Sequence, residues 1–161
     1  MPNAAVDQAM AQIRTSLLTR VNGVSPYVYD LVTVHRQRTT IEKIGALPAA
    51  VMEEGEDEPS GWSTGAMYLD RMLTVEAWIR NDPDLDEATQ VNNLWADILR
   101  AMSAGSNEYH TLADGTQTCL QTIYVGSDRL VQADIPLLWV TMRFRVRIAI
   151  SRTEPTAFGP V

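Results

Sequence analysis

The sequence has few of the residues that cross-link a domain or bind a metal, since it contains one cysteine and two histidines in 161 residues. A single cysteine excludes a disulfide framework within the chain and a zinc site built from several cysteines. No apolar run approaches the roughly 18 residues of a membrane-spanning helix. Asp7, Gln8 and Arg14 interrupt the basic and apolar blocks that a secretory signal would need. We therefore expect a protein made in the cytoplasm.

Positive charge is also scarce. The chain has 13 basic against 20 acidic residues and a formal net charge of −7. Nonspecific binding to nucleic acid depends on neutralising phosphates with Lys and Arg, so we do not expect the chain to hold DNA by its overall charge. Nine of the acids lie in two places, Glu53–Glu58 and Asp82–Glu87, and without them the basic residues would be the more numerous.

Length and composition indicate one domain. An apolar fraction of 45% is close to the globular average, and a chain of this length can bury a sizeable core. We predict a single α+β domain over residues 1–152. Pro155, Gly159 and Pro160 follow it, so residues 153–161 are predicted to form a flexible C-terminal tail.

Two segments have the apolar spacing of amphipathic helices. The first spans Asn3–Asn22, and the second spans Glu87–Ser103. Apolar residues recur every three or four positions in the second segment, at Ala88, Val91, Leu94, Ile98 and Met102. Asp84 and Glu87 stand three residues apart at its start, which predicts a capping box.

Five segments have the composition or alternation of strands. They are Tyr27–Arg38, Pro48–Glu54, Tyr68–Arg80, Thr118–Val125 and Leu138–Ser151. The last alternates apolar and polar residues throughout, which predicts one buried and one open face. Residues 53–66, rich in acids and turn formers, are predicted to form a mobile loop. The order α-β-β-β-α-β-β indicates an α+β fold: a mostly antiparallel sheet with two helices packed on one face.

No residue pattern identifies a catalytic or metal site. His35 and His110 are 75 positions apart without a second ligand at helical or strand spacing, and Cys119 has no recognisable base. Ser63 lies between Gly61 and Gly65, but without the strand-then-helix context of a nucleophile elbow. We interpret all of these residues as structural and expect no cofactor.

A stripe of arginines runs along the last strand. Arg143, Arg145 and Arg147 share one face at intervals of about 7 Å, twice the strand rise. The planar guanidinium forms paired hydrogen bonds with carboxylates, so the stripe predicts a subunit interface. Nucleic-acid binding is the competing use, which is less favoured because Trp139 and Phe144 fall on opposite faces of the strand.

An acidic run is the second charged feature, and it lies in the predicted loop. It could bind a cation, remain solvated, or form a negative surface that repels a passing polyanion. Its members are Glu53, Glu54, Glu56, Asp57 and Glu58.

The order of elements resembles that of a known family over nearly the whole chain. An N-terminal helix leads into Tyr27–Arg38, a loop precedes the strand Leu69–Asn81, the helix Glu87–Ser103 follows, and a closing β pair ends in Val140–Ile150. This layout resembles the tail terminator (tail-completion) proteins of long-tailed bacteriophages. The acidic run is longer and more charged than the resemblance requires.

The resemblance implies a structural virion protein of the tail and neck, assembled in the host cytoplasm. Six copies would form a ring that caps the tail tube, ends its polymerisation and joins the tail to the head connector. Its partners would be further copies, the tail tube protein and the connector, with no membrane. DNA would pass through without sequence-specific binding, and the loop at Glu53–Glu58 would face the lumen or the tube. No reaction is implied.

Two alternatives remain. Another phage neck or head-closure component would use similar ring contacts at a different position. A small α+β enzyme would use Asp and Glu carboxylates with His110 as acid–base groups. A monomer with a deep polar pocket would favour the enzyme, whereas assembly into rings or onto tail tubes would favour the terminator.

Overall fold

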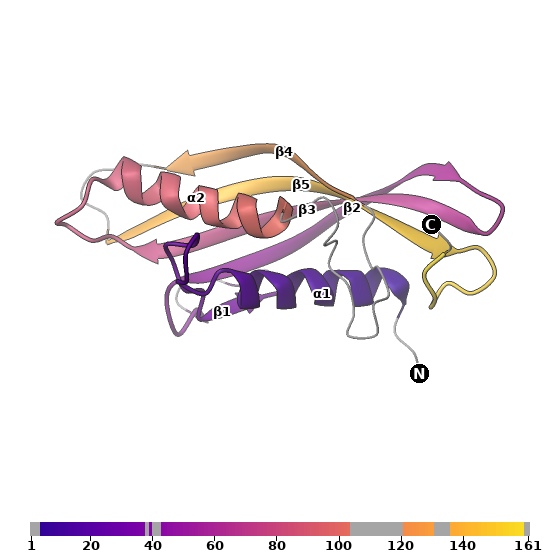
Figure 1. Ribbon diagram of the computed structural model, residues 1–161, viewed down its shortest axis with the longest axis horizontal. Coiled ribbons are helices and arrows are strands. Elements are labelled where there is room, and N and C mark those ends of the chain that lie inside the picture. Colours follow the sequence, from indigo (N-terminus) through magenta and orange to yellow (C-terminus); the bar gives the residue numbers. More distant parts are fainter. Residues whose placement is uncertain (1–3, 38, 40–42, 104–120, 131–135, 160–161) are drawn as a thin grey trace.

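The computed structural model describes residues 4–37, 39, 43–103, 121–130 and 136–159, which form one sheet with two helices on the same side (Figure 1). The elements are α1 (Ala5–Arg20), β1 (Thr33–His35), β2 (Ala49–Trp62), β3 (Ala66–Arg80), α2 (Glu87–Ser103), β4 (Gln121–Leu130) and β5 (Leu137–Ser151). The predicted α+β class, the order α-β-β-β-α-β-β and the mostly antiparallel sheet are confirmed.

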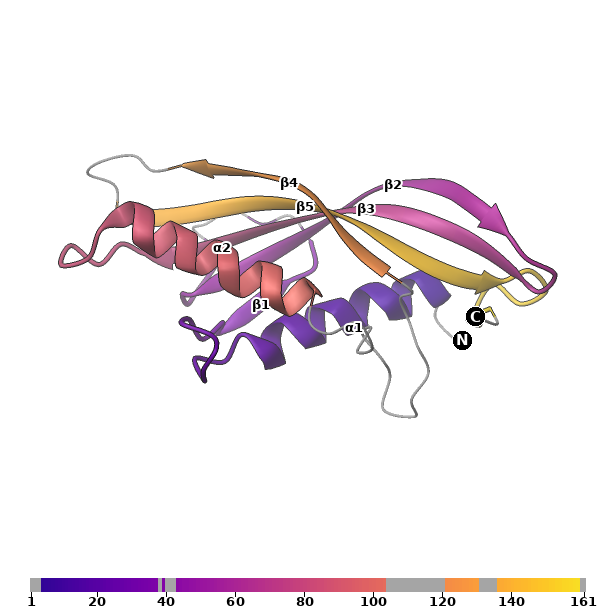
Figure 2. The same ribbon diagram turned by 45° about the horizontal axis from the view of Figure 1, so that its top comes forward.

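The strands lie in the order β1-β2-β3-β5-β4. β1 runs parallel to β2, and every other pair is antiparallel. β3 and β5 pair without interruption from Ala66–Ser151 to Arg80–Leu137, and they are the long central pair of the sheet. The hairpin of β2 and β3 extends beyond both helices, as Figures 1 and 2 show.

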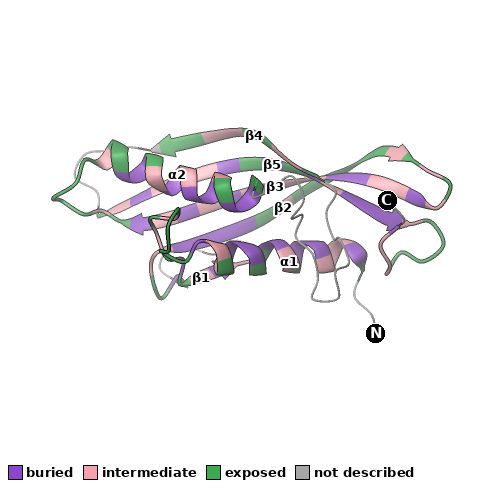
Figure 3. Ribbon diagram, in the orientation of Figure 1, coloured by how far each residue is buried: buried purple, intermediate pink, exposed green. Residues whose placement is uncertain are grey.

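The core lies between the helices and one face of the sheet (Figure 3). Alternate residues of the two central strands point into it, as their sequence alternation predicts. On these strands the buried positions include Leu73, Val75, Ala77, Ile79, Val140, Met142, Phe144, Val146 and Ile148. Burying such side chains contributes about 1.5–3 kcal/mol each, which makes this layer the main source of stability.

Among the described residues of the predicted strand Tyr27–Arg38, only Thr33–His35 form a strand, so the prediction is wrong over most of its length. The backbone N–H groups of Val28 and Tyr29 donate to Oδ2 of Asp97, at 2.8 Å each, instead of to a neighbouring strand. A side chain of α2 therefore fixes this segment, although its residues favour extended structure.

The predicted mobile acidic loop over residues 53–66 is also wrong. The strand expected to end at Glu54 continues to Trp62, and its register with β3 extends to Trp62–Met67. Only Ser63–Gly65 remain as the turn. The acidic residues stay extended because β3 supplies both backbone partners and a guanidinium, described below.

The second helix has the predicted bounds but a different cap. Oδ2 of Asp86 accepts hydrogen bonds from the backbone N–H and the hydroxyl of Thr89, both at 2.8 Å. Asp86 is thus the capping residue, and these bonds lower the pKa of its carboxyl. The capping box predicted from Asp84 and Glu87 is wrong, since Glu87 accepts a hydrogen bond from Asn81.

The described part of the predicted flexible tail, residues 153–159, is held against the body. The Gly159 N–H donates to the Ala149 carbonyl, and the Ala5 N–H donates to the Pro155 carbonyl. A Cβ on Gly159 would lie 2.4 Å from the Cβ of Ala66, so only glycine fits here. These residues pair with β5 and reach α1, and the predicted flexibility of the tail stays a prediction.

Candidate functional site

The sheet face opposite the helices is the broadest candidate surface. Trp78 and Trp139 stack there across β3 and β5, with ring centroids 4.8 Å apart. Ile44 and Leu47 pack beside Trp78 from the segment before β2. No helix covers this face within the described ranges of the chain (Figure 2). It therefore combines aromatic surface with the charged residues of β3 and β5.

The arginine stripe lies on this open face, but two of its three members have partners within the chain. Nε and Nη2 of Arg147 bind the two carboxylate oxygens of Asp70 at 2.8 and 2.9 Å. This paired contact lowers the pKa of Asp70, which is nearly buried, and raises the pKa of Arg147. Arg143 contacts Asp128 at 2.9 Å.

Arg145 is the member of the stripe that makes no ion pair among the described residues. It stands opposite Met72 on one side and Ile123 on the other, and its side chain is exposed. The stripe therefore presents one exposed cation between apolar neighbours, flanked by two neutralised pairs.

The acidic run divides in the same way. Nε and Nη2 of Arg71 bind both oxygens of Asp57, at 2.5 and 2.6 Å, and Nη1 binds Glu54 at 2.5 Å. These contacts raise the pKa of the Arg71 guanidinium, with Asp57 the main cause. A second arginine, Arg36, joins Glu54 to Asp7 of α1. Glu56 and Glu58 remain exposed.

A β-bulge places the two paired carboxylates on one side of β2. Glu54 stands opposite Leu73 and Asp57 stands opposite Arg71, so β2 has one more residue than β3 over this interval. Residues three apart then share a face, which a regular strand does not allow.

A candidate cation site is not formed, since the described residues contain no cluster of three His, Cys, Asp or Glu suited to a metal.

A polar depression of about 600 Å³ lies beside β1 and is a candidate pocket for the enzyme alternative. It is lined by Asp7, Arg14, His35, Arg36, Gln37, Thr39 and Glu54. Both of its carboxylates already bind Arg36. Nε2 of His35 is buried and has no hydrogen-bond partner among the described residues, so His35 stands beside acids that are already paired with an arginine.

The Gly-Trp-Ser-Thr-Gly segment covers the last two residues of β2 and the turn Ser63–Gly65 that leads into β3. Oγ of Ser63 accepts a hydrogen bond from the Ala66 N–H at 3.1 Å. The segment connects strand to strand, which differs from the strand-to-helix turn of a nucleophile elbow. Trp62 is 62% exposed, with the Arg152 guanidinium 5.5 Å from its ring centroid.

Two polar residues of α2 escaped the sequence interpretation. Asp97 is fully buried, and burial raises the pKa of its carboxyl. Gln90 binds the turn before α2 through the Asp82 N–H and carbonyl, both at 2.9 Å. Gln90 precedes the buried Val91, and Asp97 precedes the buried Ile98. This position beside the apolar face of the helix is the feature of the sequence that could have predicted their burial. His110, Cys119 and the first residues of the predicted strand Thr118–Val125 lie outside the described residues.

Comparison of the sequence with protein-family models gave no match, and a search of curated proteins found none with significant similarity. No helix in the part of the chain that the structure describes is long and apolar enough to cross a membrane.

Proposed function

We propose that the protein is a tail terminator subunit of a long-tailed bacteriophage, which acts as a ring of copies, caps the tail tube and joins it to the head connector. The observation that carries this proposal is the element order α-β-β-β-α-β-β with both helices on one face. This is the layout that the resemblance implies for such a subunit.

The two faces of the sheet suit the two axial sides of such a ring. One side of the molecule is helical (Figures 1 and 3), and the other is an open sheet that carries the stacked Trp78 and Trp139 and the exposed Arg145. A ring of these subunits would present different chemistry to the tube and to the connector. We assign the open face around Arg145 to one of these two axial partners.

The sequence predicts that all three arginines contact a neighbouring copy. Arg147 and Arg143 now have partners on β3 and β4, which leaves less charge for a neighbouring copy. Breaking the pair of Arg147 with the nearly buried Asp70 would leave a poorly solvated charge. We therefore propose that other surfaces form the contact between copies and that Arg145 contacts the axial partner.

The hairpin carries the acidic surface of the proposed lumen. Glu54 and Asp57 are both paired with Arg71, so Glu56 and Glu58 are the exposed carboxylates that we assign to this surface. Exposed carboxylates repel the phosphates of a passing DNA. Replacing both with lysine is expected to retard DNA passage while leaving assembly of the tail intact.

Electron microscopy of purified protein mixed with purified tail tubes tests the proposal. Wild-type protein is expected to cap one end of each tube as a ring and to stop further polymerisation of tube protein. Arg145→Glu should still form rings but lose binding to the tube or to the connector. Lys43→Glu, which makes the same charge change at an exposed residue of the segment before β2, should retain both. Wild-type protein that forms no ring in solution or on tubes would contradict the proposal.

A further inference from the structure

The two ends of the molecule carry surfaces that match each other. Figure 1 shows the β2–β3 hairpin and the turn between β3 and α2 at opposite ends of the longest axis. Each end has one large apolar side chain that is more than half exposed, Trp62 at 62% on the hairpin and Leu85 at 58% on the turn. A single exposed apolar residue is common on a protein surface, so its surroundings decide whether it belongs to a contact surface with an apolar centre and a polar rim.

The hairpin end contains a cleft of about 330 Å³. It is lined by Trp62, Met67, Ile150, Ser151, Arg152 and Pro155. This volume is at the small end of the range for ligand sites, about 300–1,000 Å³. Arg152 is exposed at its edge, stacks on Trp62, and has no carboxylate partner among the described residues. The nearby Glu154 is occupied by Thr156.

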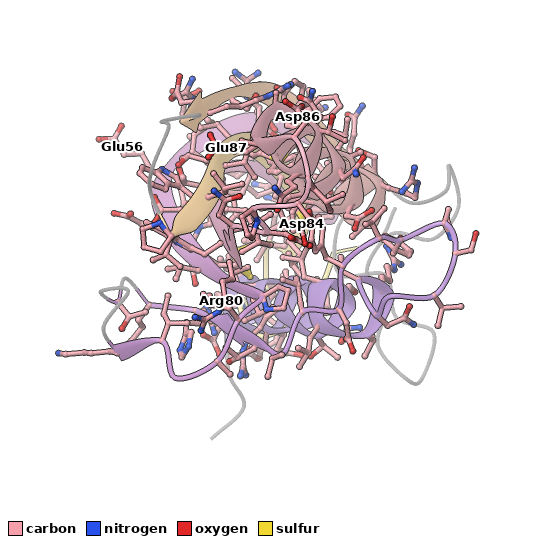
Figure 4. All side chains as sticks on the ribbon, turned by 90° about the vertical axis from the view of Figure 1, so that its left-hand side faces the viewer. Glu56, Arg80, Asp84, Asp86 and Glu87 are labelled. Carbon is pink, nitrogen blue, oxygen red and sulfur yellow. The ribbon has the colours of Figure 1, made fainter. Side chains whose placement is uncertain are left out.

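The opposite end presents an apolar side chain beside an unpaired carboxylate. Leu85 lies between Asp84 and Asp86, and Figure 4, which views this end directly, labels both acids. Asp86 is engaged as the cap of α2, whereas the exposed Asp84 carboxylate has no partner within the described residues. One end therefore offers leucine with a free anion, and the other offers an apolar cleft with a free cation.

We propose that the Asp84–Leu85 turn of one copy docks in the Trp62–Arg152 cleft of the next. Leu85 enters the cleft, and Asp84 meets Arg152. The contact joins two different surfaces of the same chain, so it is head-to-tail and generates a ring when the rotation closes. It rests on the proposed ring function and specifies which surfaces form that ring. One such contact is small, but closure holds every copy at both ends and strengthens the assembly.

Charge reversal with rescue tests the pairing of these two residues. Arg152→Glu and Asp84→Arg should each weaken self-association of the full chain about tenfold or more, measured by analytical ultracentrifugation. The double variant should restore association, because the salt bridge reforms with its charges exchanged. Asp30→Arg, at an exposed acid between α1 and β1 and outside the proposed contact, should associate like the wild type. Circular dichroism verifies that each variant is folded.

Cross-linking tests the same contact where association is weak or occurs only on tail tubes. In a Cys119→Ser background, a mixture of Leu85→Cys and Met67→Cys chains should form a disulfide-linked heterodimer. Predominant Leu85→Cys homodimers, or no cross-link on assembled rings, would overturn the docking proposal.

The outcomes separate the two proposals. Rings that form normally with Arg152→Glu and with Asp84→Arg overturn the head-to-tail contact and leave the terminator function standing. The absence of any ring from the wild type, in solution and on tubes, overturns both.

Discussion

Replacing Asp97 with alanine measures how much one buried carboxylate contributes to holding the segment before β1 against α2. Its Oδ2 accepts two backbone N–H groups at 2.8 Å, and Arg100 lies 3.3 Å from its Oδ1. A hydrogen bond to a charged group contributes about 1.5–3 kcal/mol. The two N–H groups are only partly buried, so the lower value applies to each. Asp97→Ala should lower the free energy of unfolding by about 3 kcal/mol.

Urea unfolding followed by tryptophan fluorescence and circular dichroism gives this value directly. For a domain of this size each kcal/mol shifts Tm by about 2–4 °C, so Asp97→Ala should melt about 6–12 °C lower. Asp97→Asn keeps an acceptor oxygen and buries no charge, so it should lose less than Asp97→Ala. Asp128→Ala removes a largely exposed acid and should stay within about 0.5 kcal/mol of the wild type. A loss below about 1 kcal/mol in Asp97→Ala would refute the reasoning.

The pH dependence of the same comparison tests the cause of the pKa shift. Burial raises the pKa of Asp97 in the folded protein, so the native state retains this proton to a higher pH than the unfolded chain. The stability that Asp97 contributes should therefore decrease as the pH rises from about 3.9, the ordinary Asp value, through its raised pKa. The stability difference between wild type and Asp97→Asn should follow this decrease. A difference that grows with pH would contradict desolvation as the main effect.

Three further predictions concern other contacts. Arg147 lowers the pKa of Asp70, so wild type should be more stable than Asp70→Asn by about 1–2 kcal/mol at neutral pH. In urea titrations this difference in the free energy of unfolding should shrink as the pH falls below about 4. A constant difference down to pH 2 would count against the pair. Gln90→Leu leaves the Asp82 N–H without its partner and should cost about 1–3 kcal/mol by chemical denaturation, and an unchanged midpoint would disprove this role. Gly159→Ala adds a Cβ where the nearest carbon is 2.4 Å away, and it should lower the stability measured by calorimetry by about 1–3 kcal/mol. Gly45→Ala, where a Cβ would have nothing within 4 Å, should be nearly neutral. Equal effects of the two substitutions would contradict the close approach at Gly159.

The central strands and both helices could be predicted because their burial follows a simple period. β5 alternates between buried and less buried residues from Leu138 to Ile148, and this alternation is visible in the sequence. The spacing of α2 likewise gave its exact bounds at Glu87 and Ser103. These elements pack one face on the core, so the side-chain pattern and the structure carry the same information.

The outer half of β2 could not be predicted because two effects conceal it. Acidic residues, glycine and proline disfavour strands, and the segment is extended only because β3 and Arg71 hold it. The bulges beyond Glu54 and Pro59 also change the phase of the side chains. A pattern of period two read through Glu53–Trp62 therefore assigns the wrong residues to each face.

The arginine stripe shows a similar limit for the candidate site. Alternation placed Arg143, Arg145 and Arg147 on one face, which is confirmed. Which of them is neutralised depends on what stands opposite in β3 and β4, and Asp70 lies 77 positions away from Arg147. The register between strands that are distant in the sequence decides which arginines are paired, and the sequence of one strand does not reveal that register.

The two bulges of β2 have a consequence for the geometry of any assembly. Each inserts one residue that bends the strand and increases its twist, so two single residues set the direction in which the hairpin leaves the body. Deleting Gly55 and Ser60 would leave the flanking pairs with β3 in register but redirect the tip. If copies meet end to end, this direction fixes the angle between neighbours and hence how many close the circle. The diameter of such a ring would then depend on the two residues that the bulges insert into β2.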